Sequence, residues 1–253
     1  MQNPHILSVF RPALSGLLLL TLAGCALPPA PSDPAMPPDS SGVEASARLS
    51  ADAAARQFAL VVKTVEPVAE EVCREKRQDD RCNFRIAIDP RPRRPANAFQ
   101  TLDDNGQPVL IFTLALIADM QNPDELAFVM SHEASHHILR HLSKQAAYAN
   151  ETAQAYAEAA EKAGASKAQV RRAAEKGADV GARSHANEFE LQADSLGALI
   201  ARAAGYDALR GAQYFNRLPD PEKEFLGSHP PNAARMENVR RTLATQTLTL
   251  PTS

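Results

Sequence analysis

The chain has 253 residues, of which 44% are hydrophobic, and a formal net charge of −3 at pH 7. A chain of this length can bury the core of one domain, and its slightly acidic balance argues against a nucleic-acid partner.

The N-terminus has the pattern of an export signal. An apolar run over residues 13–24 follows a short segment whose one basic residue is Arg11, and it is too short to span a bilayer. The run ends in Leu22-Ala23-Gly24-Cys25, which resembles the lipobox of bacterial lipoproteins. We therefore expect residues 1–24 to be a signal peptide and Cys25 to carry acyl chains that anchor the protein. The alternative is an ordinary cleaved signal with an incidental cysteine.

Residues 25–48 are dominated by Pro, Ser, Ala and Asp, a composition that cannot bury a core and predicts a tether. Ala26 follows the cysteine, whereas in lipoproteins Asp at that position signals retention in the inner membrane. By this resemblance we expect a lipid-anchored protein in the outer membrane of a Gram-negative bacterium, facing the periplasm.

A long helix is predicted for residues 50–77, because Ser50 can cap it and apolar residues recur at helical spacing. Once Cys25 is assigned to lipid, Cys73 and Cys82 remain. An exported compartment permits disulfides and the intervening segment is short enough to close, so we predict a disulfide between them. Two free thiols are the alternative.

Three strands are predicted after this helix. Residues 84–88 alternate with period two, and residues 97–102 and 108–113 flank the turn sequence Asp103-Asp104-Asn105-Gly106. The last two strands form a predicted hairpin in a small sheet. A short helix is expected at residues 113–119.

Histidines follow at metal-binding spacing. The stretch beginning at Pro123 is predicted to be helical, so that His132 and His136, four residues apart, share one face. Glu133 is offset by about 100° around the axis and can address a water molecule at a metal held by the two imidazoles. This is the HExxH pattern of zinc proteases, whose catalytic sites need a third protein ligand and an open position.

Two further histidines, His137 and His141, have the same spacing, but the residues between them provide no general base. We interpret them as helix-surface histidines or as supports for the ligands. The following segment, residues 143–185, is rich in Ala, Glu, Lys and Gln, with a break at Gly164 and Ser166. It is predicted to be a polar, solvent-facing helical insertion that cannot cross a membrane.

The third ligand is expected in the segment from Glu188 to Gly197. Glu190 and Asp194 are four residues apart and share a helical face. One carboxylate can bind the metal while the other holds the ring N–H of a ligating histidine.

HExxH followed by E-x-x-A-D-x-x-G resembles peptidase family M48, which includes HtpX-like and CAAX prenyl proteases and periplasmic relatives acting in outer-membrane quality control. Further matching segments lie at 97–99, 125–126, 204–207, 229–230 and 235. The resemblance covers about residues 85–240 and implies a mostly helical α+β, zincin-like (gluzincin) metalloprotease domain, with a small sheet beside the HExxH helix. The predicted domain is 49–246, followed by a tail at 247–253.

The resemblance also implies the site. One Zn²⁺ per chain would be held by His132, His136 and Glu190, with Glu133 as the general base and Asp194 supporting a ligand. Two departures are Ser135, where many relatives have Gly, and Asn187, where many have a basic residue. Neither residue belongs to the expected metal chemistry.

In the family, the segment carrying the His229-Pro230 motif lies near the zinc. Three roles stay open for His229: a fourth ligand that plugs the site and keeps the protease latent, a donor to the transition-state oxyanion, or a cap of the helix predicted at 232–245. Arg235 is interpreted as a structural ion-pair partner. In many metalloproteases an edge strand lies along the cleft, and the substrate backbone adds to it as another strand. We assign that role to residues 109–112; the alternative is that they form a plain core strand.

The function implied is that of a lipid-anchored periplasmic zinc endopeptidase, which hydrolyses envelope proteins and peptides in outer-membrane quality control. The outer-membrane assembly machinery is a further expected partner. The alternative is a periplasmic chaperone or assembly factor with latent protease activity, which the polar helices and the plug would suit. A purely structural zinc site is disfavoured, because it has no use for Glu133.

Overall fold

The computed structural model describes residues 49–77, 81–220 and 229–248. All of them belong to the second of the two units into which the chain divides, Ala45–Ser253. The predicted signal peptide, the lipidated Cys25, the tether at 25–48 and the tail from residue 249 onward lie outside the described residues.

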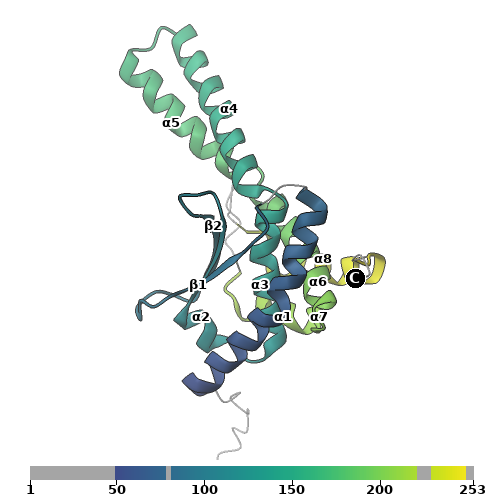
Figure 1. Ribbon diagram of the computed structural model, residues 1–253. Coiled ribbons are helices and arrows are strands. Elements are labelled where there is room, and N and C mark those ends of the chain that lie inside the picture. The colour runs from purple at the N-terminus through teal and green to yellow at the C-terminus, as the bar shows by residue number, and fades with distance from the viewer. Residues whose placement is uncertain (1–48, 78–80, 221–228, 249–253) are drawn as a thin grey trace, which may run out of the picture. The chain divides into compact units, whose positions relative to one another are not determined.

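The described elements, in chain order, are α1 (Ala51–Arg77), β1 (Arg85–Asp89), β2 (Ala98–Leu102), β3 (Pro108–Thr113), α2 (Leu114–Asp119), α3 (Pro123–Ile138), α4 (His141–Lys162), α5 (Lys167–Arg183), α6 (Ala186–Ala203), α7 (Ala208–Ala212), the 3-10 helix η1 (Gln213–Arg217) and α8 (Asn232–Thr245). This mostly helical arrangement with one small sheet confirms the predicted fold class (Figure 1). Within the described ranges, we find no helix with the length and apolarity needed to span a membrane.

Helix α1 provides one wall of the core. Its apolar stripe is buried, with Val61 and Val65 fully inaccessible, and the Phe58 ring meets Phe112 of β3 edge-on at 5.4 Å. The end of α1 is joined covalently to the segment before β1 by a disulfide between Cys73 and Cys82, as predicted. The sheet therefore packs against α1 at a position that the disulfide helps to hold.

The sheet has the strand order β1-β3-β2, with β3 parallel to β1 and antiparallel to β2. Residues 109–112 therefore pair on both sides, and the prediction that they form the edge strand beside the cleft is wrong; the core-strand alternative is what the structure shows. The physical reason is burial: Val109, Leu110 and Phe112 are at most 2% exposed, as expected of a central strand covered on both faces. Strands β1 and β2 are the two edge strands.

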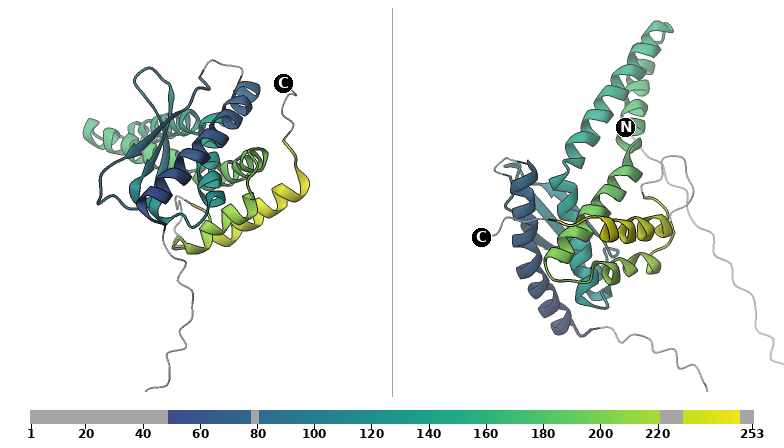
Figure 2. Two further views of the ribbon diagram at one scale, coloured as in Figure 1. Left: turned by 60° about the horizontal axis from the view of Figure 1, so that its bottom comes forward. Right: turned by 90° about the vertical axis from the view of Figure 1, so that its right-hand side faces the viewer.

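Helices α4 and α5 form a hairpin that extends away from the sheet and from the other helices (Figures 1 and 2). It turns near Gly164, where the chain takes a positive φ of 74°. The two helices approach closely because Gly177 and Gly181 carry no side chain: a Cβ there would lie 2.6 Å from the Thr152 carbonyl oxygen and 2.2 Å from that of Tyr148. Backbone proximity thus replaces large apolar side chains in this Ala-rich segment.

Candidate metal centre

Helix α3 holds the HExxH segment inside the domain. Its start is set by Asn122, whose side chain accepts a hydrogen bond from the Glu125 amide at 3.1 Å, and by Pro123 in the first turn. The Glu125 carboxylate in turn accepts hydrogen bonds from both terminal nitrogens of Arg217, at 2.5 and 2.8 Å. Most residues of the helix are buried, His132 among them.

Helix α6 crosses α3 at His132, and Gly197 permits the contact. A Cβ at residue 197 would lie 2.9 Å from the backbone nitrogen of His132 and 3.0 Å from its Cα. Because the backbones touch there, the side chains one and two turns earlier on α6, Asp194 and Glu190, reach the imidazoles.

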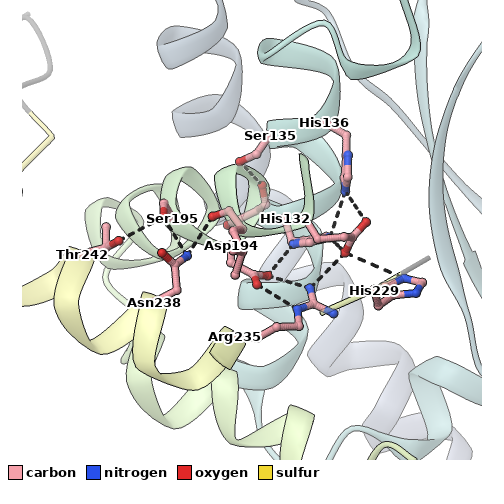
Figure 3. Close-up of polar contacts among 12 residues, drawn as sticks. His132, Ser135, His136, Asp194, Ser195, His229, Arg235, Asn238 and Thr242 are labelled. Carbon is pink, nitrogen blue, oxygen red and sulfur yellow. Dashed lines mark hydrogen bonds and ion pairs between the residues drawn. The ribbon is translucent and has the colours of Figure 1, made fainter. Parts of the chain in front are cut away.

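Three donor groups converge at this crossing (Figure 3). The Nε2 atoms of His132 and His136 lie 3.0 Å apart, and the Glu190 carboxylate oxygens lie 3.4 Å from the first and 3.5 Å from the second. Ligand atoms from all three residues fall within 4.8 Å of one another. The structure thus brings together the three residues predicted from sequence as ligands.

This donor set fits zinc. Tetrahedral zinc with bonds of about 2.0–2.1 Å to nitrogen and oxygen requires ligand atoms about 3.3–3.4 Å apart, close to the observed separations. Neutral imidazole and carboxylate are also the ligand types found in catalytic zinc sites with an open position. The residues present therefore form a possible zinc site.

The imidazole of His132 has a carboxylate next to its second ring nitrogen. Nδ1 of His132 lies 2.9 Å from Oδ1 of Asp194, which is fully buried. Arg235 from α8 donates to both Asp194 oxygens at 2.8 and 2.6 Å, and its Nη2 lies 3.2 Å from the Glu190 carboxylate. Its guanidinium also covers the Phe215 ring at 3.9 Å. Arg235 is thus a buried ion-pair partner of two acids at the site.

The charges in the cluster follow from these contacts. Burial alone would lower the pKa of His132, but its contacts with Asp194 and Glu190 raise that pKa to about 10. Burial would raise the pKa of Glu190, yet the neighbouring histidines and Arg235 hold it well below its usual range. Glu190 therefore stays ionised, and its charge is balanced by the neighbouring His132 and Arg235.

The second imidazole faces another histidine. Nδ1 of His136 lies 2.9 Å from Nδ1 of His141, whose Nε2 lies 3.1 Å from Oε1 of Gln192 on α6. Helix α3 ends at Ile138 and a left-handed residue, Arg140 (φ 60°), turns the chain back, so His141 opens α4.

Neither of the two additional histidines is a surface residue. His141 is 3% exposed and supports a candidate ligand, while His137 is 4% exposed and its Nε2 lies 2.6 Å from the backbone oxygen of Arg81. The helix-surface interpretation is wrong for both, because the chain turns between them instead of continuing as one helix.

A cleft of about 690 Å³ opens over these groups. Its walls include residues 97–100, at and before the edge strand β2, and a largely apolar group on the opposite elements: Leu116, Phe128, Tyr214, Phe215 and Leu218. Glu133 lines it too, and burial raises the pKa of Glu133 to about 7, with the charge of His132 opposing that shift and the charge of Glu190 adding to it. A carboxylate that exchanges a proton near neutral pH therefore faces the cleft beside the three donors.

Comparison with known protein families gives a match to peptidase family M48 over residues 55–243, most of the chain. The chain belongs to peptidase family M48. Members of this family are zinc metallopeptidases, in agreement with the donor set described above. No match is found among curated proteins.

His229 lies at the rim of the cleft. Its side chain is half exposed, and its Nε2 lies 3.8 Å from a Glu190 oxygen, outside the three-residue donor group (Figure 3). The N-cap of α8 is Pro231, so His229 does not occupy the cap position that was one of its three predicted roles.

Two supports of the M48 site, Gly197 and Asn238, are not predicted by the sequence analysis, although a glycine inside a helical pattern signals close backbone packing. For His141, support of a candidate ligand is one of the two roles predicted, and the structure shows that one. Asn238 of α8 donates to the Leu191 carbonyl at 2.8 Å and to Ser195 at 2.9 Å, fastening α8 to α6 (Figure 3), and no sequence pattern singled it out.

Proposed function

We propose that this M48 protein is a zinc-dependent endopeptidase that hydrolyses proteins of the bacterial envelope, in outer-membrane protein quality control. The observation that carries the proposal is the convergence of His132, His136 and Glu190 beside Glu133 in an open cleft. A structural metal site would have no need of an acid with a near-neutral pKa or of an open cleft.

The roles of the side chains follow from their positions. A bound zinc ion supplies Lewis acidity that polarises the scissile carbonyl and acidifies the attacking water. Glu133 takes the proton from that water and delivers it to the leaving amine, and its pKa of about 7 suits both directions of transfer. Asp194 lies 2.9 Å from Nδ1 of His132, and this carboxylate favours the ring orientation in which the other nitrogen is directed at the metal.

The substrate backbone is proposed to pair with β2. This strand lies at the outside of the sheet, and residues 97–100 border the cleft. An extended segment laid along β2 would place a peptide bond over the metal through main-chain hydrogen bonds, with little dependence on sequence. Folded proteins do not present such a segment, so unfolded chains are the expected substrates.

The replacement Glu133→Gln tests the catalytic role. It keeps the shape of the side chain but removes the base, so we expect one zinc ion per chain to be retained and hydrolysis of an unfolded protein such as casein to fall by about 10²–10⁴-fold. Zinc content is measured by atomic spectroscopy and cleavage by release of labelled peptides. Glu237→Gln, on the exposed face of α8, is the matched control. Unchanged hydrolysis in Glu133→Gln would refute the mechanism.

We further propose that residues 1–24 direct export, that Cys25 is lipidated and that the domain faces the periplasm from the outer membrane. The Cys73–Cys82 disulfide supports an oxidising compartment. In the full chain, Cys25→Ser is expected to remove the protein from the outer-membrane fraction. If the variant still fractionates with the outer membrane, anchoring through Cys25 is wrong.

A second candidate function is that of a chaperone or assembly factor for outer-membrane proteins. The observation that favours it is the α4–α5 hairpin, which extends beyond the catalytic elements and exposes mostly polar residues (Figure 2). Restoration of a deletion strain by Glu133→Gln would favour this function, and failure of that variant would favour proteolysis.

A further inference from the structure

The two histidine ligands of the proposed site are supported in different ways. His132 has a carboxylate behind it, whereas His136 has another imidazole, that of His141, at 2.9 Å. A carboxylate can only accept a hydrogen bond, but an imidazole nitrogen can accept or donate according to its tautomer. The orientation of His136 therefore depends on which nitrogen of His141 carries the proton.

The required tautomer can be worked out from the metal side. Nε2 of His136 faces the other donors, so in the neutral ring its proton must sit on Nδ1. That N–H points at Nδ1 of His141, which must then be the accepting nitrogen. The proton of His141 is consequently placed on Nε2, facing Oε1 of Gln192 at 3.1 Å.

The same tautomer follows independently from the opposite end of the chain of contacts. The Glu188 carboxylate accepts from Nε2 of Gln192 at 2.8 Å, and because a carboxylate offers no proton, the amide nitrogen must face Glu188. The amide oxygen of Gln192 is then left facing His141 and requires a donor there. Both ends of the relay, Glu188–Gln192–His141–His136, thus demand the same direction for every proton.

The His141 ring is also held in place. It is 3% exposed and lies flat against the Phe189 ring of α6, with centroids 4.4 Å apart and planes inclined by 13°. The left-handed turn at Arg140 sets the start of α4 so that His141 faces back toward α3. Stacking fixes the plane of the ring, and Gln192 fixes its protonation.

We propose that His141 is a positioning residue, which accepts the Nδ1 proton of His136 and thereby keeps Nε2 of His136 directed at the metal, with Gln192 and Glu188 setting the tautomer of His141. This inference rests on the proposed role of His136 as a ligand and adds to it a specific support, located where the α4–α5 hairpin begins.

The first test is zinc affinity of the full chain, measured by competition with a chromogenic chelator. His141→Leu removes the acceptor and is expected to raise the zinc dissociation constant about 10–100-fold, the range typical for loss of a ligand's hydrogen-bond partner. His141→Asn, whose amide oxygen can take the place of Nδ1, is expected to recover most of the affinity. His137→Leu is the matched control, since it removes another buried histidine of the same region, whose Nε2 contacts the backbone oxygen of Arg81; its zinc affinity should stay unchanged.

The second test needs no variant and so does not depend on how well His141→Leu folds. Nitrogen-15 NMR of labelled histidine rings in the zinc-loaded chain should show His141 protonated on Nε2 and bare on Nδ1. The reverse tautomer, or an unchanged zinc affinity in His141→Leu, overturns the proposal. His136→Ala separates the two claims: if it binds zinc normally, the ligand role of His136 fails, whereas if it loses zinc while His141→Leu does not, only the positioning role fails.

Discussion

At the scale of single residues, each candidate ligand is held by a partner that points away from the metal position. His132 is backed by Asp194, His136 by His141 and Glu190 by Arg235. Contacts of this kind orient the candidate ligands, and a buried polar group left without one costs about 1–3 kcal/mol. His229 lies at the rim of the site, 3.8 Å from a Glu190 oxygen and outside the three-residue donor group.

The two remaining roles of His229 predict opposite effects of its replacement on activity. Because its Nε2 lies outside the three-residue donor group yet lines the cleft, we expect it to donate to the oxyanion of the transition state. His229→Ala should then lower kcat by about 10²–10³-fold with little change in KM. Steady-state hydrolysis of a fluorogenic peptide measures both constants. A rise in activity would instead identify His229 as the plug of a latent site.

The pairing of His132 with His136 could be predicted because residues four apart on a helix share a face wherever the helix lies. For His141 the sequence left two roles open, since its position depends on the end of α3. Nothing in the local sequence marks the turn, which is made by Arg140 in a conformation that residues other than glycine rarely adopt.

At the scale of elements, the site is a crossing of two helices whose separation is set by one missing side chain. Gly197 lets α6 touch the backbone of α3 at His132. The sequence-based interpretation recognised both helices and the ligands on each, because their periodicity and motifs are local. The order of the strands could not be predicted from the sequence in the same way, because a hairpin leaves open which of its two strands pairs with β1. In the structure the buried strand β3 pairs with β1.

Gly197→Ala tests the crossing. Alanine normally favours a helix over glycine by up to about 1 kcal/mol, but here its Cβ would meet backbone atoms that cannot move independently. We expect a net loss of about 1–3 kcal/mol in unfolding free energy and weaker zinc binding, because α6 must shift with Glu190.

Denaturant unfolding and chelator competition measure the two effects. Gly177→Ala is the matched control: it introduces a similar clash within the α4–α5 hairpin, 2.6 Å from the Thr152 oxygen, and should leave zinc affinity intact. Equal loss of affinity in both variants would show that the crossing has no special importance.

At the scale of the whole described domain, the catalytic elements and the distal hairpin are separable. The root of the hairpin borders the cleft through Leu142, Gln145 and Arg183, whereas its distal part packs only within itself in the views of Figures 1 and 2. Its polar composition predicted exposure correctly, but composition alone cannot reveal the direction in which a hairpin extends.

Shortening the hairpin tests this separation. Thr152 and Gly177 face each other across the two helices, so residues 153–176 can be replaced by a Gly-Ser linker of about four residues. We expect zinc affinity and hydrolysis of a short peptide to stay near those of the full chain, because no candidate ligand or cleft residue is removed. Loss of peptide hydrolysis with zinc still bound would mean that the distal hairpin takes part in catalysis. Capture of unfolded outer-membrane proteins by the shortened and full chains then measures any chaperone contribution.

The contact between Arg235 and the two acids also bears on biosynthesis. Arg235 lies on α8, the last of the described helices, and contacts both Asp194 and Glu190. Without this guanidinium the two carboxylates would have less positive charge to offset their repulsion. A polypeptide that ends before α8 is therefore expected to form the metal centre poorly.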